Sequence, residues 1–169
     1  RFVLETACGQ MADWDAAGLH LRMAVNVSVV QLRQPDFVEQ VRSALMLSGL
    51  PSHRLELEIT EGAFVSDVLD ALEKLNKVKA MGVELAVDDF GTGYSSLSYL
   101  KQMPVDRLKI DQSFVRDIPH SADDCAIVRA ILAMAVNLDI DVIAEGVETE
   151  EQLEFLRAEG CQEIQGFLL

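Results

Sequence analysis

The sequence has 169 residues, half of them hydrophobic, so it is long enough to fold as one domain around a substantial core. Its 28 acidic and 14 basic residues give a net charge of −14, which argues against a surface that binds DNA or anionic membranes. A small anionic ligand remains compatible with this charge if metal ions supply the positive charge.

The first residues, RFVLETACGQ, have the spacing of a helix interior, because Leu4, Ala7, Met11 and Trp14 recur at helical intervals. We therefore expect the chain to begin inside a helix. The last residues, QGFLL, stop equally abruptly. Residues 1–169 are thus expected to form part of one larger domain.

Short segments rich in Val, Ile and Leu predict strands. In chain order they are MAVNVSV (23–29), RLELEIT (54–60), VELAVDD (83–89), DRLKID (106–111) and DVIAEGV (141–147). Segments with helical periodicity lie between them, and Thr149 followed by Gln152 predicts the capping box of a last helix ending near Gly160. This alternation predicts one α/β domain with a mainly parallel sheet, either open or closed into a barrel.

The alternation of side chains along each strand favours the barrel. In LELEIT, for example, Leu55, Leu57 and Ile59 share one face, and the acidic residues between them share the other. An open doubly wound sheet would be apolar on both faces, whereas here one face turns polar late in each strand. The C-terminal ends of barrel strands carry the chemistry in (β/α) barrels. The side chains expected to ring this mouth are Asn26, Glu58, Asp88, Asp89, Lys109 and Glu145.

These polar residues predict a metal site. Asn26, Glu58, Asp88 and Asp89 offer only oxygen donors, which Mg²⁺ and Mn²⁺ prefer. Adjacent carboxylates repel unless a cation or proton lies between them, and one carboxylate that bridges two ions is typical of phosphoester cleavage. Lys109 could then add positive charge near the phosphate or hold the water that Glu145 positions. The alternative is structural, since an Asp pair before Gly is common in turns.

The chain has no apolar run of about 18 residues, as a membrane span requires, and no signal peptide. Its cysteines, Cys8, Cys125 and Cys161, form no CxxC pair, which favours reduced and mostly buried thiols. Both features indicate a cytoplasmic domain, with any membrane attachment supplied by other parts of the parent protein.

Several segments resemble, in the same order, those of the EAL-domain cyclic di-GMP phosphodiesterases. They are VNVS, ELEITEGAF, VDDFGTGYSSLSYLKQMPVDRLKIDQSFV, VIAEGVET and QGF. The resemblance covers Phe2 to Leu169 and implies a modified TIM-type barrel, here incomplete at its N-terminal strands. It also implies metal-dependent hydrolysis of one phosphodiester bond of cyclic di-GMP with two Mg²⁺ or Mn²⁺ ions, in bacterial second-messenger signalling.

By the same resemblance, Asn26, Glu58, Asp88 and Asp89 match the metal ligands, with Asp88 bridging both ions. Lys109, Glu145 and Gln165 match the residues around the nucleophilic water. Glu61 matches a residue that anchors the loop after the Asp pair, and Asp111 is expected behind the ligands. That loop is expected to move and to contact the substrate and a second copy of the chain in a homodimer; its substrate-side residues are Phe90, Gly91, Thr92, Gly93, Tyr94 and Ser95.

One departure from the family pattern leaves alternatives open. The Glu-Ala-Leu segment that gives the family its name, with one metal ligand, is not in this sequence, so we expect a partial domain. Sensory or diguanylate-cyclase-like (GGDEF) domains are expected elsewhere in the parent protein. The alternatives are a non-catalytic cyclic di-GMP receptor and, without the resemblance, a metal-dependent barrel lyase that uses Lys109 as base or Schiff-base amine.

Overall fold

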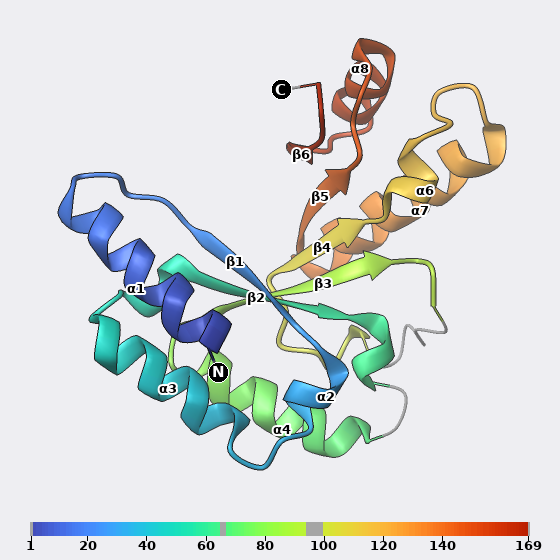
Figure 1. Ribbon diagram of the computed structural model, residues 1–169. Helices are drawn as coiled ribbons and strands as arrows, with labels where there is room; N and C mark the ends of the chain where they lie inside the picture. Colours follow the sequence, from blue (N-terminus) through green and yellow to red (C-terminus); the bar gives the residue numbers. More distant parts are fainter. Residues whose placement is uncertain (1, 65–66, 94–99, 169) are drawn as a thin grey trace.

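The computed structural model describes residues 2–64, 67–93 and 100–168 (Figure 1). Within them, six parallel strands form one sheet in the order of the sequence. The strands are β1 (Met23–Val27), β2 (Leu55–Thr60), β3 (Glu84–Phe90), β4 (Arg107–Ile110), β5 (Asp141–Glu145) and β6 (Glu163–Gln165). All five predicted strands are confirmed with shifted ends, whereas β6 follows the last helix and was not predicted.

Helices connect the strands, as a parallel sheet requires. The longer ones are α1 (Phe2–Ala16), α3 (Phe37–Ser48), α4 (Val68–Lys79), α7 (Ala122–Leu138) and α8 (Glu150–Ala158). Shorter elements are α2 (Val29–Leu32), α6 (Gln112–Val115) and the 3₁₀ helices η1 (Ser52–Arg54) and η2 (Glu61–Phe64). The predicted capping box is confirmed, because the Thr149 side chain accepts from the Gln152 amide while the Gln152 side chain accepts from the Thr149 amide.

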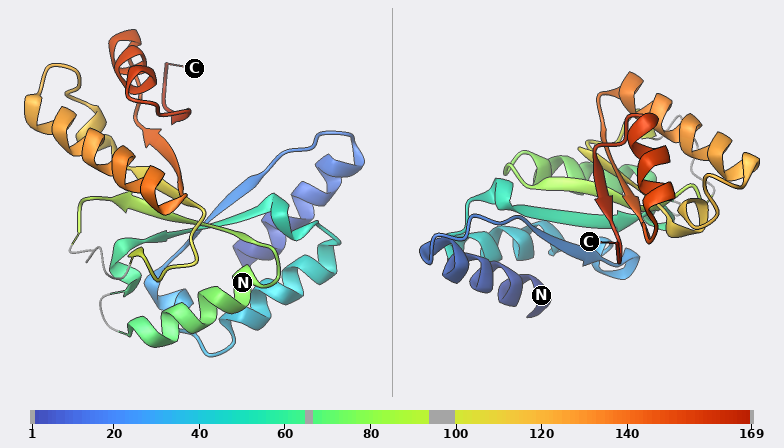
Figure 2. Two further views of the ribbon diagram at one scale, coloured as in Figure 1. Left: turned by 180° about the vertical axis from the view of Figure 1, so that it is seen from behind. Right: turned by 90° about the horizontal axis from the view of Figure 1, so that it is seen from above.

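The sheet is curved like part of a barrel wall, and the helices cover its convex side (Figures 1 and 2). The side chains that face these helices are buried, among them Leu57, Leu85 and Leu108. The opposite, concave side carries Glu58, Lys109 and other polar residues. This division confirms the prediction of an incomplete (β/α) barrel that is apolar outside and polar inside.

Two further expectations concern buried thiols and membranes. Cys8, Cys125 and Cys161 are all buried and unpaired, as predicted. Among the described residues, none of the helices has the length and hydropathy that a membrane span requires.

Candidate functional site

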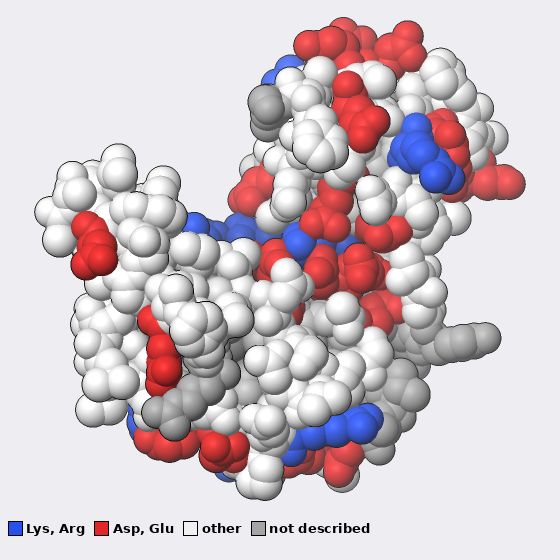
Figure 3. Space-filling model, in the orientation of Figure 1, with Lys and Arg blue, Asp and Glu red and all other residues white. Residues whose placement is uncertain are grey.

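The polar residues predicted from the sequence meet at the C-terminal ends of the strands. Neighbouring strands pair in register, so that Asn26 lies opposite Glu58, Thr60 opposite Asp88, and Glu145 opposite Gln165. Residues of a strand that are two positions apart share a face. The alternating pattern therefore places these side chains on the concave side of the sheet. Figure 3 shows acidic side chains gathered in the middle of this view of the molecule, with basic ones among them.

Lys109 lies at the centre of this group. Its Nζ atom is 2.7 Å from Oε1 of Glu58 on β2 and 2.7 Å from Oε1 of Glu145 on β5. It also donates a hydrogen bond of 2.9 Å to Oδ1 of Asp88 on β3. Only 5% of the Lys109 side chain is exposed, so one ammonium group joins three strands in a region with little water.

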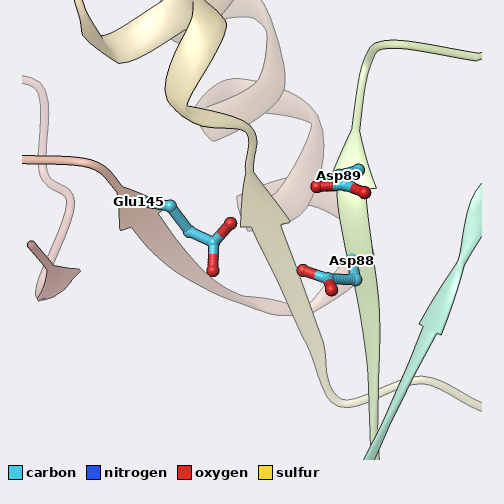
Figure 4. A group of neighbouring side chains, drawn as sticks. All are labelled: Asp88, Asp89 and Glu145. Carbon is cyan, nitrogen blue, oxygen red and sulfur yellow. The ribbon is translucent and has the colours of Figure 1, made fainter. Parts of the chain in front are cut away.

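Asp88, Asp89 and Glu145 form a group that could hold a metal ion. Each offers one carboxylate oxygen, and these oxygens lie within 4.8 Å of one another. In Figure 4 the carboxylates of Asp88 on β3 and Glu145 on β5 point toward each other from either side of β4, with Asp89 near the end of β3. Three carboxylates and no nitrogen or sulfur donor suit a hard divalent cation such as Mg²⁺ or Mn²⁺. Glu145, expected beside the water, thus lies where it could also ligate metal.

A backbone irregularity brings the second aspartate into this group. Asp89 has a φ of 53°, and the pairing of β3 with β4 shifts register between Val87 and Phe90. In a regular strand Asp89 would face away from Asp88. The bulge turns it back toward the concave side, a use of bulges that is common beside active sites.

The electrostatics of the group reflect crowded negative charge. Burial raises the pKa of Asp89, and the nearby Asp88 and Asp111 raise it further. Burial also raises the pKa of Glu145, against the opposing effect of Lys109. Burial alone would lower the pKa of Lys109, but its hydrogen bonds to Glu145, Glu58 and Asp88 prevail, and the pKa lies above its usual value. The ammonium is therefore charged at neutral pH. A further cation would stabilise the ionised form of the carboxylates around it.

Asp111 stands behind Asp89. It caps α6, where its Oδ1 accepts the backbone N–H of Ser113 at 2.9 Å, and its charge raises the pKa of the nearby Asp89. Burial acts to raise the pKa of Asp111, but the hydrogen bonds from Ser113 outweigh it and the pKa is lowered. Asp111 is thus ionised next to Asp89. Its negative charge makes binding of a cation beside Asp89 more favourable.

Glu61 holds the start of the loop after the Asp pair. Its carboxylate is buried, and Oε1 accepts the backbone N–H of Gly91 at 3.1 Å. Gly91 has a φ of +99°, which favours glycine, and a Cβ on Gly93 would lie 2.3 Å from Oε2 of Glu61. Thr92 turns back, since its hydroxyl donates to the carbonyl of Asp89 at 2.9 Å. The predicted loop residues Tyr94 and Ser95 lie outside the described residues.

Two predicted residues are less enclosed. Asn26 on β1 and Gln165 on β6 are both exposed and flank the group from the two opposite edges of the sheet. Gln165 is held in place by the backbone, because its carbonyl accepts the N–H of Val147 at 3.1 Å.

Sequence reasoning missed a second set of charges on the same face. Arg107 on β4 is 5% exposed and pairs with Glu56 on β2, with further acidic partners on β3, β5 and β6. Its position two residues before Lys109 was a usable signal, because it places both cations on one face of β4.

Taken together, the group provides oxygen ligands, a fixed ammonium and further carboxylates beside it. Such an arrangement can bind divalent cations, neutralise a phosphoryl group and orient a water molecule.

The chain matches the EAL domain family model over residues 1–169. It is 46% identical over 169 residues to the bifunctional diguanylate cyclase/cyclic di-GMP phosphodiesterase MucR of Pseudomonas aeruginosa, covering 99% of the chain and 25% of MucR. The chain spans 20 to 25% of the length of MucR and two other curated relatives that it matches.

Solved structures agree. The complex of the PaMucR phosphodiesterase with c-di-GMP superimposes with a TM-score of 0.94 at 46% identity, covering 99% of this chain and 68% of that one. A manganese/cy-diGMP complex of Klebsiella pneumoniae BlrP1 gives a TM-score of 0.86 at 34% identity, covering 99% and 43%.

Proposed function

The chain belongs to the EAL domain family, and on this basis we propose that it serves as the catalytic part of a cyclic di-GMP phosphodiesterase. The reaction is hydrolysis of one phosphodiester bond of cyclic di-GMP to the linear dinucleotide. The observation that carries the proposal is the group of Asp88, Asp89 and Glu145, with carboxylate oxygens within 4.8 Å of one another and Lys109 beside them. The likeness to a manganese/cy-diGMP complex supports divalent metal use.

We assign the metal ligands from the family resemblance, and their donor chemistry and place in the sheet fit that assignment. Asp88, Asp89 and Glu145 would hold the divalent cations, and Asn26 on β1 and Glu58 on β2 would add further oxygen ligands. When bound, the Mg²⁺ or Mn²⁺ ions supply positive charge to the phosphoryl oxygens and lower the pKa of water. The oxygen-only donor set and the raised pKa values of Asp89 and Glu145 fit such ions.

The remaining residues act on water and substrate. Glu145 accepts a proton from the attacking water, Lys109 holds that water and the phosphate by its fixed ammonium, and Gln165 orients the water from β6. Glu61 and Asp111 hold the loop and Asp89 in place. The residues that follow Asp89 contact the substrate and a second copy of the chain.

The wider setting is proposed from the relatives. The chain is one part, covering residues 1–169, of an EAL domain in a longer cytoplasmic signalling protein. Sensory or diguanylate cyclase domains accompany it; MucR, for example, is a bifunctional diguanylate cyclase/cyclic di-GMP phosphodiesterase.

Hydrolysis can be tested with the purified protein, cyclic di-GMP and either Mn²⁺ or Mg²⁺. Chromatography should show the linear dinucleotide with metal and none with excess EDTA. Tight binding of cyclic di-GMP without hydrolysis in the presence of metal would favour the receptor alternative. The absence of both binding and hydrolysis of cyclic di-GMP in the presence of metal would overturn the proposal.

A further inference from the structure

A second ionic layer lies under the metal group on the concave face of the sheet. Arg107 and Lys109 are two residues apart on β4, so their side chains share a face and are about 7 Å apart along the strand. Glu56 and Glu58 on β2 have the same relation, as do Glu163 and Gln165 on β6. Arg107, Glu56 and Glu163 thus each have a site residue two positions further along the same strand.

The contacts of Arg107 reach most of the sheet. One terminal nitrogen pairs with the Glu56 carboxylate and lies 4.0 Å from Oε2 of Glu84 on β3. The other is 3.2 Å from Oε1 of Glu163 on β6 and 3.9 Å from Oδ2 of Asp141 on β5. The side chains of Arg107 and Glu56 are only 6% and 4% exposed, so this pair is the part of the layer with the least access to water.

The layer also continues toward the first strand. Arg22, immediately before β1, lies 2.7 Å from the same Oε2 atom of Glu84 that faces Arg107. A chain of alternating charges therefore crosses the sheet from β1 to β6. Its geometry depends on a guanidinium, whose planar fork can pair with carboxylates on both sides at once.

We infer that Arg107 is a positioning residue that sets the spacing of β2, β4 and β6 and so holds Glu58, Lys109 and Gln165 at working distances. The inference rests on the metal site proposed above. The physical link is short: a strand is stiff over two residues, so a lateral shift at Glu56 or Glu163 reaches the site residue above it. Residues that orient metal ligands from behind typically change metal affinity 10- to 100-fold when altered.

Two variants separate positioning from simple stabilisation. Arg107→Met combined with Glu56→Gln removes the buried pair without leaving an unpaired buried charge, because Glu84 keeps Arg22 and the side chains of Glu163 and Asp141 are 50% and 73% exposed. The protein should therefore keep its fold. Arg107→Lys keeps the charge but cannot reach Glu56 and Glu163 together. Both variants should show native circular dichroism, with a Kd for Mn²⁺ raised about tenfold for the double variant and severalfold for Arg107→Lys. Titration calorimetry on the purified protein measures these values.

A metal-free readout tests the same point. The buried, triply paired ammonium of Lys109 should give a resolved ¹H–¹⁵N signal in EDTA, and both variants should shift or broaden it. This signal tests the role of Arg107 even if the protein binds no Mn²⁺. The absence of Mn²⁺ binding would count against the proposed function and not against the role of Arg107. If the double variant does not fold, the Kd for Mn²⁺ and the Lys109 signal of Arg107→Lys test the inference.

The control is Arg129→Met, which removes an arginine paired with Glu159 at 2.8 Å outside the concave face. It should leave the Kd for Mn²⁺ and the Lys109 signal unchanged. The inference is overturned if folded Arg107 variants bind Mn²⁺ as the unaltered protein does and keep the Lys109 signal in place.

Discussion

The Nζ atom of Lys109 on β4 lies 2.7 Å from Oε1 of Glu145 on β5, inside the group of carboxylates that could hold metal. The same ammonium contacts Glu58 and Asp88. It therefore balances part of the negative charge that would otherwise oppose folding of the metal-free site. The Lys109 ammonium and these carboxylates stabilise one another in the folded protein. A substitution of Lys109 or of a carboxylate should therefore change both the stability of the fold and the affinity for metal.

Lys109→Met should destabilise the metal-free protein by about 3 kcal/mol, because it leaves several poorly solvated carboxylates without their cation. Mn²⁺ should restore part of this loss by binding to the folded state. Urea unfolding in EDTA and in Mn²⁺ measures both effects. Lys77→Met, which removes an exposed pair with Glu73, should cost less than about 1 kcal/mol. Equal stability of Lys109→Met and the unaltered protein in EDTA would contradict the role given to Lys109.

Asp89→Asn should stabilise the metal-free protein while weakening metal binding. Burial and the charges of Asp88 and Asp111 raise the pKa of Asp89, so removing its charge relieves repulsion. Asn also tolerates the positive φ of 53° at this position. We expect the Tm in EDTA to rise by about 2 °C.

The same variant should lose most of the Tm increase that Mn²⁺ gives the unaltered protein. Asp139→Asn is the matched control, because Asp139 has a similar φ of 57° at the end of α7, away from the site. A lower Tm in EDTA for Asp89→Asn would show that the charge of Asp89 is not unfavourable.

The affinity for Mn²⁺ should fall as the pH is lowered from 7.5 toward 5. Metal binds the ionised carboxylates, and the pKa values of Asp89 and Glu145 are raised from ordinary values of 3.8 and 4.5, mainly by burial. Protons therefore compete with the metal at higher pH than at ordinary carboxylates. Titration calorimetry at several pH values measures this, and Asp89→Asn should flatten the dependence. Affinity that is constant down to pH 4.5 would be the contrary result.

Glu145→Gln should lower kcat for cyclic di-GMP hydrolysis about 10³-fold, because the amide cannot accept the proton of the attacking water. It should also weaken Mn²⁺ binding, since Glu145 lies with Asp88 and Asp89. Glu148→Gln, at an exposed position of the same EGVET segment, should retain activity. Robust metal-supported turnover by Glu145→Gln would exclude the proposed role of this residue.

Gly93→Ala should disturb the loop that Glu61 holds. The new Cβ would lie 2.3 Å from Oε2 of Glu61, so the buried carboxylate or the loop must shift. We expect kcat/KM to fall about tenfold, because small displacements of a positioned group reduce turnover strongly. Gly9→Ala is the control, as its Cβ meets nothing within 4 Å in α1 and should leave activity unchanged. Unchanged kcat/KM of Gly93→Ala would show that the position of this loop does not affect catalysis.

Much of the fold could be predicted because its causes are local. The alternation in LELEIT and the helical spacing in α1 depend on neighbours in sequence, and both identify which side of an element is buried. The short strand β6 could not be predicted, since three residues carry too little pattern. The family resemblance supplied the roles of Asn26, Glu58 and Gln165, which remain proposals for this chain.

The sequence by itself determined the type of fold, the polar rim and the identity of the residues on it. Only the tertiary structure decided that Lys109 contacts three carboxylates, that a bulge turns Asp89 toward Asp88, and that Arg107 forms a layer beneath them. The reason is physical. Periodicity tells which face a side chain occupies, but distances between strands depend on curvature and register, which the packing of the whole sheet sets.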